Sequence, residues 1–539
     1  MAKPKTPNQK RKYGELNKRL AKYVMLVESI YEDLNLEAAK IVGITDFTID
    51  SDRTFMWSDY PQTRKRIRDL QERFVEDIGS VIYSGTSEEW KNSNEVQDLL
   101  ANKVLQTYGA TIGKEKYEIL YQPNNDALKA FQQRKDKGFT ISDKLWNQST
   151  LYKQELEEAI SCAIQKGTSA ITLSKQISKY LLDSPQLQKD YKERFGKASR
   201  AMDCEYRSIR LAASEINMAY RQAENLRWQQ MDFVVGYEIK LSNNHTCNGK
   251  PFQDICDILA GKYPKDFQWT GWHPLCRCYK IPILKTEEEF WEWDGRNEAT
   301  TASVNEVKDV PDAFKKWVLD NQERISTAKK RNTLPYFLRD NKSVYQKITV
   351  ESSISEIVKR ASSVGDEVQS IAERIAIKNG GYVTPINFKS TTSITRKVIT
   401  EGITPYDIKG AVRTTIIVPK SRIEDVLEEL YKTEGFLRLK RQKPESFMGY
   451  SGNIVNIRTT NGLTAEIQVN TERMIFAKER PEDAKRILGE KRWEEIHNET
   501  GMEGGLGHKY YEQWRILDKS SNEALKIVEK SIEYYSHFR

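Results

Sequence analysis

The chain lacks long hydrophobic runs, since no window of its 539 residues approaches the roughly 18 consecutive apolar residues of a membrane span. We therefore expect no membrane partner. The N-terminus is polar and no apolar stretch follows it, which argues against a cleaved secretory signal. A strong charge of one sign is also lacking, because 85 basic residues stand against 77 acidic ones and the net charge is +8. So small an excess does not by itself predict nucleic-acid binding.

Histidine and cysteine are scarce, with five and six residues, which excludes a disulfide-based scaffold. One short segment nevertheless holds most of the cysteines and two of the histidines: His245, Cys247, Cys256, His273, Cys276 and Cys278. Closely spaced thiolates and imidazoles are the ligands of tetrahedral zinc, so a structural Zn²⁺ site at Cys247, Cys256, His273, Cys276 and Cys278 is one interpretation. A transient disulfide and plain buried thiols are the alternatives.

The chain contains enough apolar residues, 38%, for folded cores, and at roughly 100–200 residues per domain its length predicts two to four domains. Helical periodicity dominates from residue 11 to about 231, and an alternating strand pattern at 233–241 leads into the cysteine segment. We expect a helical N-terminal region (1–139), a second domain with a small β knuckle (140–285) and a helical connector (286–350).

From residue 351 to 539, strand-like runs alternate with helical ones, which predicts an α+β domain with a mixed sheet flanked by helices. The fold class is therefore multidomain, with a mainly α N-terminal half. The expected strands are 410–418, 452–459 and 463–469, and the expected helices are 423–432, 473–477, 481–488, 506–517 and 522–535.

Residues 140–285 resemble the MuF-type head morphogenesis proteins, the minor capsid proteins of tailed phages. The matching pieces are the helical stretch 159–181 with its Gly-Thr-Ser break, the segment 210–215, and His-Pro-Leu-Cys-Arg-Cys at 273–278. The resemblance implies a structural role beside phage portal and capsid proteins, with no catalytic residue here. The protein is then expected in the virion or in the cytoplasm of the bacterial host.

Polar residues at strand ends indicate a different task for the last domain. Lys389 and Lys397 follow a strand-like run at 382–386, and Asp407 precedes Arg413. Cations around one carboxylate are typical of a polyphosphate site with a divalent ion. Further along, Glu466 and Gln468 alternate on one strand and should leave the same face.

The order of these motifs resembles the synthetase domain of RelA/SpoT-like enzymes over residues 374–517. That family transfers the β,γ-pyrophosphate of ATP to a ribose hydroxyl with Mg²⁺. The resemblance implies ATP-phosphate contacts at Lys389, Ser393, Lys397 and Arg413. It also implies a magnesium ligand at Asp407, an acid that completes the metal site or activates the hydroxyl at Glu466, with Gln468 beside it, and acceptor contacts at Tyr450 and His508.

Two departures from the family put a guanine-nucleotide acceptor in doubt: Asn387 replaces the usual arginine before the Lys389-like position, and Ile454 replaces a histidine after Tyr450. The hydrolase half of long RelA/SpoT proteins has no counterpart, so unopposed product would make the domain a toxin, with an immunity protein as a possible partner. The acceptor is a nucleotide or the 3′ end of tRNA. A third alternative is a structural protein with an inactive C-terminal domain.

A purely structural role is an alternative for two of these features, His508 and a basic run at 438–443. His508 stands where a helix is expected to begin and is as well suited to capping or packing there. Most of the net charge lies after residue 300, partly in a basic run at 438–443. Such a run is usually a solvated loop, but just before Tyr450 it is equally suited to grip the phosphates of an acceptor.

Overall fold

The computed structural model describes residues 6–45, 47, 53–108, 113–164, 169–242, 246–247, 250–251, 253–292, 302–443 and 447–539. The chain divides into two compact units, Met1–Tyr345 and Gln346–Arg539. Helix α14 (Lys342–Ser363) contains the boundary. Within the described ranges, no helix combines the length and the apolar character that crossing a membrane requires.

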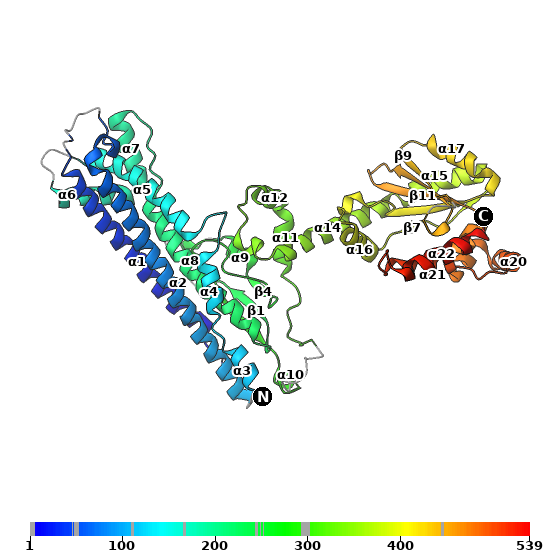
Figure 1. Ribbon diagram of the computed structural model, residues 1–539, viewed down its shortest axis with the longest axis horizontal. Coiled ribbons are helices and arrows are strands. Elements are labelled where there is room, and N and C mark those ends of the chain that lie inside the picture. Colours follow the sequence, from blue (N-terminus) through cyan, green and yellow to red (C-terminus); the bar gives the residue numbers. More distant parts are fainter. Residues whose placement is uncertain are drawn as a thin grey trace. The chain divides into compact units, whose positions relative to one another are not determined.

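The first unit is mainly helical, as predicted. Its longest helices, α1 (Gln9–Val42), α2 (Arg64–Tyr108), α5 (Ile141–Ala163) and α8 (Cys204–Gln230), run side by side (Figure 1). The shorter ones are α3 (Lys114–Leu120), α4 (Asn125–Gln133), α6 (Ala170–Leu182) and α7 (Ser184–Phe195). Helical spacing explains the packing, because Val27, Tyr31 and Leu34 of α1 share one buried face. Gly167 and Thr168 of the predicted break lie outside the described residues, whereas Ser169 caps α6.

A small antiparallel sheet follows α8, with strand order β4 (Gly261–Tyr263), β1 (Val234–Lys240), β5 (Tyr279–Leu284). The hairpin β2 (Thr246–Cys247) and β3 (Lys250–Pro251), the short helix α9 (Ile255–Leu259) and α10 (Glu287–Glu292) complete this part. A buried ion pair ties the sheet to the helices: Lys280 of β5 lies 3.5 Å from Glu224 of α8, and the Tyr13 hydroxyl of α1 donates to the same carboxylate at 2.6 Å.

Part of the segment expected as a connector packs into the first unit. It contains α11 (Asp312–Asp320), α12 (Gln322–Lys330) and α13 (Tyr336–Arg339). Phe314 and Phe337 are buried, and their rings contact Phe267 and Trp272 at centroid distances of 5.4 Å and 5.2 Å. Burial of aromatic side chains gives this segment a core of its own against the small sheet.

The second unit is built on a mixed sheet, as predicted. The strand order is β6 (Tyr382–Val383), β8 (Val412–Ile417), β11 (Thr464–Asn470), β10 (Asn453–Arg458), β9 (Phe436–Arg441), with β7 (Asn387–Phe388) also paired to β8. Strands β8 and β11 are parallel, and the other recorded pairs are antiparallel.

Helices lie on both faces of this sheet. In Figure 1, α15 (Gly365–Lys378) and α17 (Ile423–Tyr431) lie on one side of the sheet, and they pack on β6, β8, β9 and β11. The remaining helices are α16 (Thr391–Glu401), α18 (Glu472–Lys478), α19 (Pro481–Leu488), α20 (Glu490–Thr500), α21 (Leu506–Arg515) and α22 (Asn522–Ser536). Of these, α20, α21 and α22 gather on the opposite side of the sheet (Figure 1). Sequence periodicity missed α16, α20 and β9. The basic run at 438–443 is therefore not a loop over most of its length, because Phe436–Arg441 forms an edge strand.

Candidate active site

The face of the sheet opposite α15 and α17 carries the polar side chains. Ile467 and Val469 of β11 are buried in the core beneath those helices. Alternation along the strand places Glu466 and Gln468 on the other face. The prediction that both polar side chains leave the same face of one strand is confirmed.

A row of polar residues crosses this face through Glu466. Its partner on β8 is Arg413 and its partner on β10 is Asn456. The row continues from Asn456 to Arg438 on β9, whose Nε donates to the Asn456 Oδ1 at 2.7 Å. Neighbouring strands lie about 4.8 Å apart, so the Arg413 and Glu466 side chains are adjacent.

The Glu466 carboxylate is held in one orientation. Its Oε1 accepts a hydrogen bond from Gln468 Nε2 at 2.7 Å, and Gln468 Oε1 in turn accepts one from Lys478 Nζ at 2.9 Å. On the other side lies Gly410, where an added Cβ would come within 3.0 Å of Glu466 Oε2. A carboxylate fixed in this way is preorganised for chemistry.

Three of the predicted phosphate contacts surround this carboxylate. The Lys389 backbone N–H donates to the Ala411 carbonyl at 2.9 Å, which fixes the lysine beside β8. Burial lowers the pKa of Lys389, and the neighbouring charges of Lys397 and Arg413 lower it further. Lys397 also lies 3.8 Å from Glu401.

Neither Lys389 nor Arg413 has a recorded ion pair within the part of the chain that the structure describes. Three cations gathered around one carboxylate leave an excess of positive charge, which is suited to an anionic ligand.

Two charged residues that the sequence reasoning missed extend the site. Lys478, at the end of α18, forms an ion pair with Glu479 at 3.0 Å. Burial raises the pKa of Glu479, but Lys478, Arg413 and His508 lower it, and the net pKa is below the usual range. His508 Nε2 is buried and has no hydrogen-bond partner among the described residues. No sequence signal marked Lys478 and Glu479, because a charged pair at a helix end is usually solvated.

Tyr450 closes the site on the side of α22. Its hydroxyl is hydrogen-bonded to the Asn470 amide group at 2.9–3.0 Å. Its ring lies edge-on to Tyr535 at a centroid distance of 5.6 Å, and Lys478 Nζ lies 5.7 Å from the ring centroid. The ring is half-buried, so it packs against the core while part of its surface stays accessible.

The structure does not bring Asp407 to this cluster. Its carboxylate caps the short helical turn Pro405–Asp407 and accepts a hydrogen bond from Thr404 Oγ1 at 2.7 Å. No contact with Glu466 is recorded among the described residues. Ser393 lies in the first turn of α16, where its N–H donates to Ser390 Oγ at 3.2 Å. A helix N-terminus in this position favours anions.

The basic strand β9 divides its charges between the two faces of the sheet. Lys440 is in register with Ile454 and, through it, with Gln468, so Lys440 and Arg438 belong to the polar face. Arg441 points the other way and donates to Glu424 of α17 at 2.7 Å.

A separate cavity of about 510 Å³ lies at the opposite end of β8 and β11. Its lining includes Arg473 and Arg492, but these arginines already pair with Glu499 and Glu472 at 2.7 Å and 2.8 Å. The cations of the polar face are therefore the better candidates for a phosphate site.

The predicted metal ligands of the first unit are brought together in part. Cys256, Cys276 and Cys278 form one group, and His273 adjoins Cys256. Cys247 belongs to β2, but its side chain, like His245, lies outside the described residues.

Comparisons with known proteins address the second unit. Among curated proteins, the (p)ppApp synthetase toxin Tas1 of Pseudomonas aeruginosa (strain UCBPP-PA14) is 35% identical over 181 residues, which are 33% of this chain and 41% of that protein. The C-terminal region is homologous to this toxin. The predicted resemblance to RelA/SpoT-type pyrophosphokinases is thereby confirmed at the level of the domain.

The chain spans less than half the length of this curated relative. A solved structure of the complex between the Type VI effector Tas1 and its immunity protein has 35% sequence identity, covers 35% of this chain and 97% of that chain, and has a TM-score of 0.33. No family model matches the chain. These relatives offer no support for a phage-head role of residues 140–285, which stays a prediction.

Proposed function

We propose that the second unit is a pyrophosphokinase that uses ATP and an adenosine nucleotide. In this reaction a ribose hydroxyl of the acceptor attacks the β-phosphorus of ATP. The bond from that phosphorus to the oxygen bridging to the α-phosphate breaks, AMP leaves, and the hydroxyl proton passes to a base. Glu466 beside Arg413, in the cluster that includes Lys389 and Lys397, carries the proposal.

The cations are suited to the triphosphate. Lys389, Lys397 and Arg413 neutralise phosphate oxygens, and the N-terminus of α16 with Ser393 adds backbone donors. Neutralisation matters because catalysis of phosphoryl transfer rests mainly on positioning and charge stabilisation. Lys478 lies beside the same arginine and serves the leaving phosphate or the acceptor.

The acids divide the remaining tasks. Gln468 holds Glu466 Oε1, which leaves Oε2 to accept the hydroxyl proton or to bind a cation. Mg²⁺ is held by one or two carboxylates together with substrate phosphates, so Glu466 fits the ion, whereas Asp407 caps its own turn and is not placed beside Glu466. When bound, the ion would supply further charge neutralisation.

The acceptor is placed between Tyr450 and the edge strand β9. A half-exposed aromatic ring offers a stacking surface for a base, and stacking alone tolerates any base. Similarity to a (p)ppApp synthetase favours adenine, and the two departures from the family, Asn387 and Ile454, are consistent with an acceptor other than a guanine nucleotide. Arg438 and Lys440 then face the acceptor phosphates. The 3′ end of tRNA is the second candidate, because these basic residues are equally suited to a tRNA backbone.

Acceptor identity is tested by incubating the full chain with Mg²⁺, ATP labelled at the γ-phosphate, and ADP, GDP or total tRNA in separate reactions. We expect AMP and a labelled adenosine product, with little label in GDP or tRNA. Label at the tRNA 3′ end would show that tRNA, and not a nucleotide, is the acceptor. An intact, folded protein that labels none of the three would contradict the proposal and favour an inactive domain.

We also propose that the active chain stops the growth of the bacterium in which it is made, and that a neutralising protein accompanies it. Depletion of adenine nucleotides follows from unopposed synthesis. Expression should arrest growth, and expression of the Glu466→Gln variant should not. If the unchanged chain and Glu466→Gln arrest growth equally, the toxicity does not depend on the proposed reaction.

The role proposed for the first unit rests on its resemblance to MuF-type proteins alone. We propose that it attaches the enzyme to a phage head, so that the chain travels in the virion or remains in the host cytoplasm. Mass spectrometry of purified particles from a lysogen encoding this chain is the test. Particles that lack the chain would contradict packaging.

A further inference from the structure

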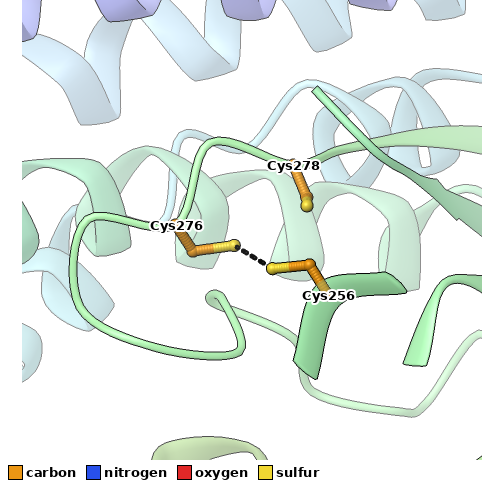
Figure 2. A group of neighbouring side chains, drawn as sticks. All are labelled: Cys256, Cys276 and Cys278. Carbon is orange, nitrogen blue, oxygen red and sulfur yellow. Dashed lines mark hydrogen bonds between the residues drawn. The ribbon is translucent and has the colours of Figure 1, made fainter. Parts of the chain in front are cut away.

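A cluster of three buried cysteines lies in the first unit, far along the chain from the residues used above. Cys256 belongs to α9, and Cys276 and Cys278 belong to the segment that leads into β5 (Figure 2). Their sulfur atoms all lie within 4.8 Å of one another. Two chain segments therefore bring three thiols to one point, although each segment alone carries at most two.

The sulfur spacing matches a tetrahedral metal site. Zinc binds thiolate at about 2.3 Å, and two ligands at this distance in a tetrahedron are about 3.8 Å apart. The Sγ atoms of Cys256 and Cys276 are 3.8 Å apart.

His273 adjoins this cluster on the side of Cys256, where its ring nitrogen, Cys256 Sγ and an Asp254 carboxylate oxygen all lie within 4.8 Å of one another. Its Nδ1 lies 2.7 Å from the Pro274 carbonyl, and since a carbonyl only accepts, Nδ1 carries the hydrogen. The other ring nitrogen, Nε2, lies 3.2 Å from Cys256 Sγ and 3.3 Å from Asp254 Oδ2. A metal cation bound between these atoms would be coordinated by the ring nitrogen and the sulfur together. A backbone carbonyl that holds the far ring nitrogen is the usual support of a metal-binding histidine.

The loop that carries two of the thiols is held rigidly by α8. Arg221 Nη2 donates to the carbonyls of Cys276 and Cys278 at 2.7 Å and 2.8 Å, and Asn217 Nδ2 donates to that of Cys276 at 2.9 Å. Gly271, at φ +129°, lies between Arg221 and Cys276, where an added Cβ would come 2.6 Å from Arg221 Nη1. The site is thus built by a second layer of contacts before any ion binds.

Charge supports the same conclusion. Arg221 is buried, and among the described residues no carboxylate forms an ion pair with it. A buried guanidinium is costly unless its charge is offset, and the Glu224 carboxylate that interacts with it is shared with Lys280. Three thiolates and one neutral imidazole around a dication carry a net charge of −1, which would offset the guanidinium next to them.

We propose that Cys256, Cys276, Cys278 and His273 bind one Zn²⁺, which fastens α9 and the segment 273–278 to α8. Four nitrogen and sulfur ligands leave no open position, so the site is structural. It is independent of the reaction proposed for the second unit.

The test uses the full chain carrying Glu466→Gln, so that expression does not depend on the proposed toxicity. Elemental analysis of protein purified without chelators should give about one zinc per chain. Replacement by Co²⁺ should give thiolate-to-cobalt charge-transfer absorption and the visible bands of a tetrahedral site. Protein without zinc after incubation with ZnCl₂, or a Cys256–Cys276 disulfide in peptides mapped without reduction, would overturn the proposal.

Single variants identify the ligands. Cys276→Ser should lose zinc, whereas Cys204→Ser, which changes a buried cysteine elsewhere in the same unit, should keep it. Because Cys276→Ser is at risk of misfolding, His273→Ala provides a second variant at a partly exposed side chain. It should bind zinc at least ~10-fold more weakly. Unchanged zinc affinity in His273→Ala would remove the histidine from the site, and unchanged zinc content in Cys276→Ser would overturn the site itself.

Discussion

Adding one methyl group at Gly410 should displace the Glu466 carboxylate, and the chain offers a matched control at Gly402. Gly410 adopts φ +71° and Gly402 adopts φ +62°, so alanine pays a similar backbone cost at both, about 1 kcal/mol. The surroundings differ. A Cβ at Gly410 would lie 3.0 Å from Glu466 Oε2 and 3.3 Å from Glu466 Cβ, whereas one at Gly402 would meet nothing within 4 Å.

We expect both variants to lower the melting temperature of the second unit by about 2–4 °C, the shift that 1 kcal/mol gives in a unit of this size. Only Gly410→Ala should lower kcat, by ~10-fold or more, because a misplacement of 1 Å can cost about 100-fold. Thermal unfolding and the rate of AMP formation from ATP measure the two effects. Equal kcat in the two alanine variants would refute the role given to the position of Glu466.

Three further predictions concern lysines. Lys478→Met removes the donor to Gln468, so the free energy of unfolding should fall by ~1.5–3 kcal/mol and kcat by ~10-fold. The control is Lys485→Met, which removes a partly exposed lysine that pairs with Glu490, without contact to Gln468, and should leave kcat unchanged. The lowered pKa of Lys389 should make activity decline at a lower alkaline pH than an ordinary lysine pKa of about 10.4 would give, and Lys389→Arg should remove that decline from the pH–rate profile. Burial lowers the pKa of Lys280 to about 8, so between pH 8 and about 10 the unfolded chain binds more protons than the folded chain. The free energy of unfolding of the first unit should therefore increase as the pH rises through this range. Urea unfolding measures this increase, which should be absent in Lys280→Met.

Specific outcomes would contradict each of these. Equal kcat in Lys478→Met and Lys485→Met would show that Gln468 needs no anchor. An unchanged alkaline limb in Lys389→Arg would assign that limb to another group. A first unit whose stability stays flat from pH 8 to 10 would show that Lys280 titrates normally.

The sequence predicted the elements whose pattern is set by burial on one side. Strand β11 alternates apolar and polar residues, β8 and β10 are short runs rich in β-branched residues, and α17 has a strongly amphipathic pattern, so each was found within a few residues of its bounds. Strand β9 was missed because its outward residues are cationic and it pairs on one edge only. Part of the expected connector was not recognised as belonging to the first unit, because its aromatic residues contact their partners only in the folded structure.

The site was predictable where one strand or one loop carries it. Glu466 with Gln468, and Lys389 with Lys397, are local patterns. Their meeting with Arg413 depends on the parallel register of β8 and β11, which no local pattern records. Lys478 and Glu479 join through the position of α18, and Asp407 was expected at the metal but caps a turn in the structure.

The most direct test of the central claim is the conversion of ATP by the full chain with Mg²⁺ and ADP, compared between Glu466→Gln and Glu424→Gln. Glu424 lies on the helix side of the sheet and pairs with Arg441, so its variant controls for the loss of one carboxylate. We predict that AMP and pyrophosphorylated adenosine product form in equal amounts, and that the unchanged chain and Glu424→Gln form them at the same rate. The rate in Glu466→Gln should be ~10²–10⁴-fold lower. Undiminished turnover in folded Glu466→Gln would contradict the account.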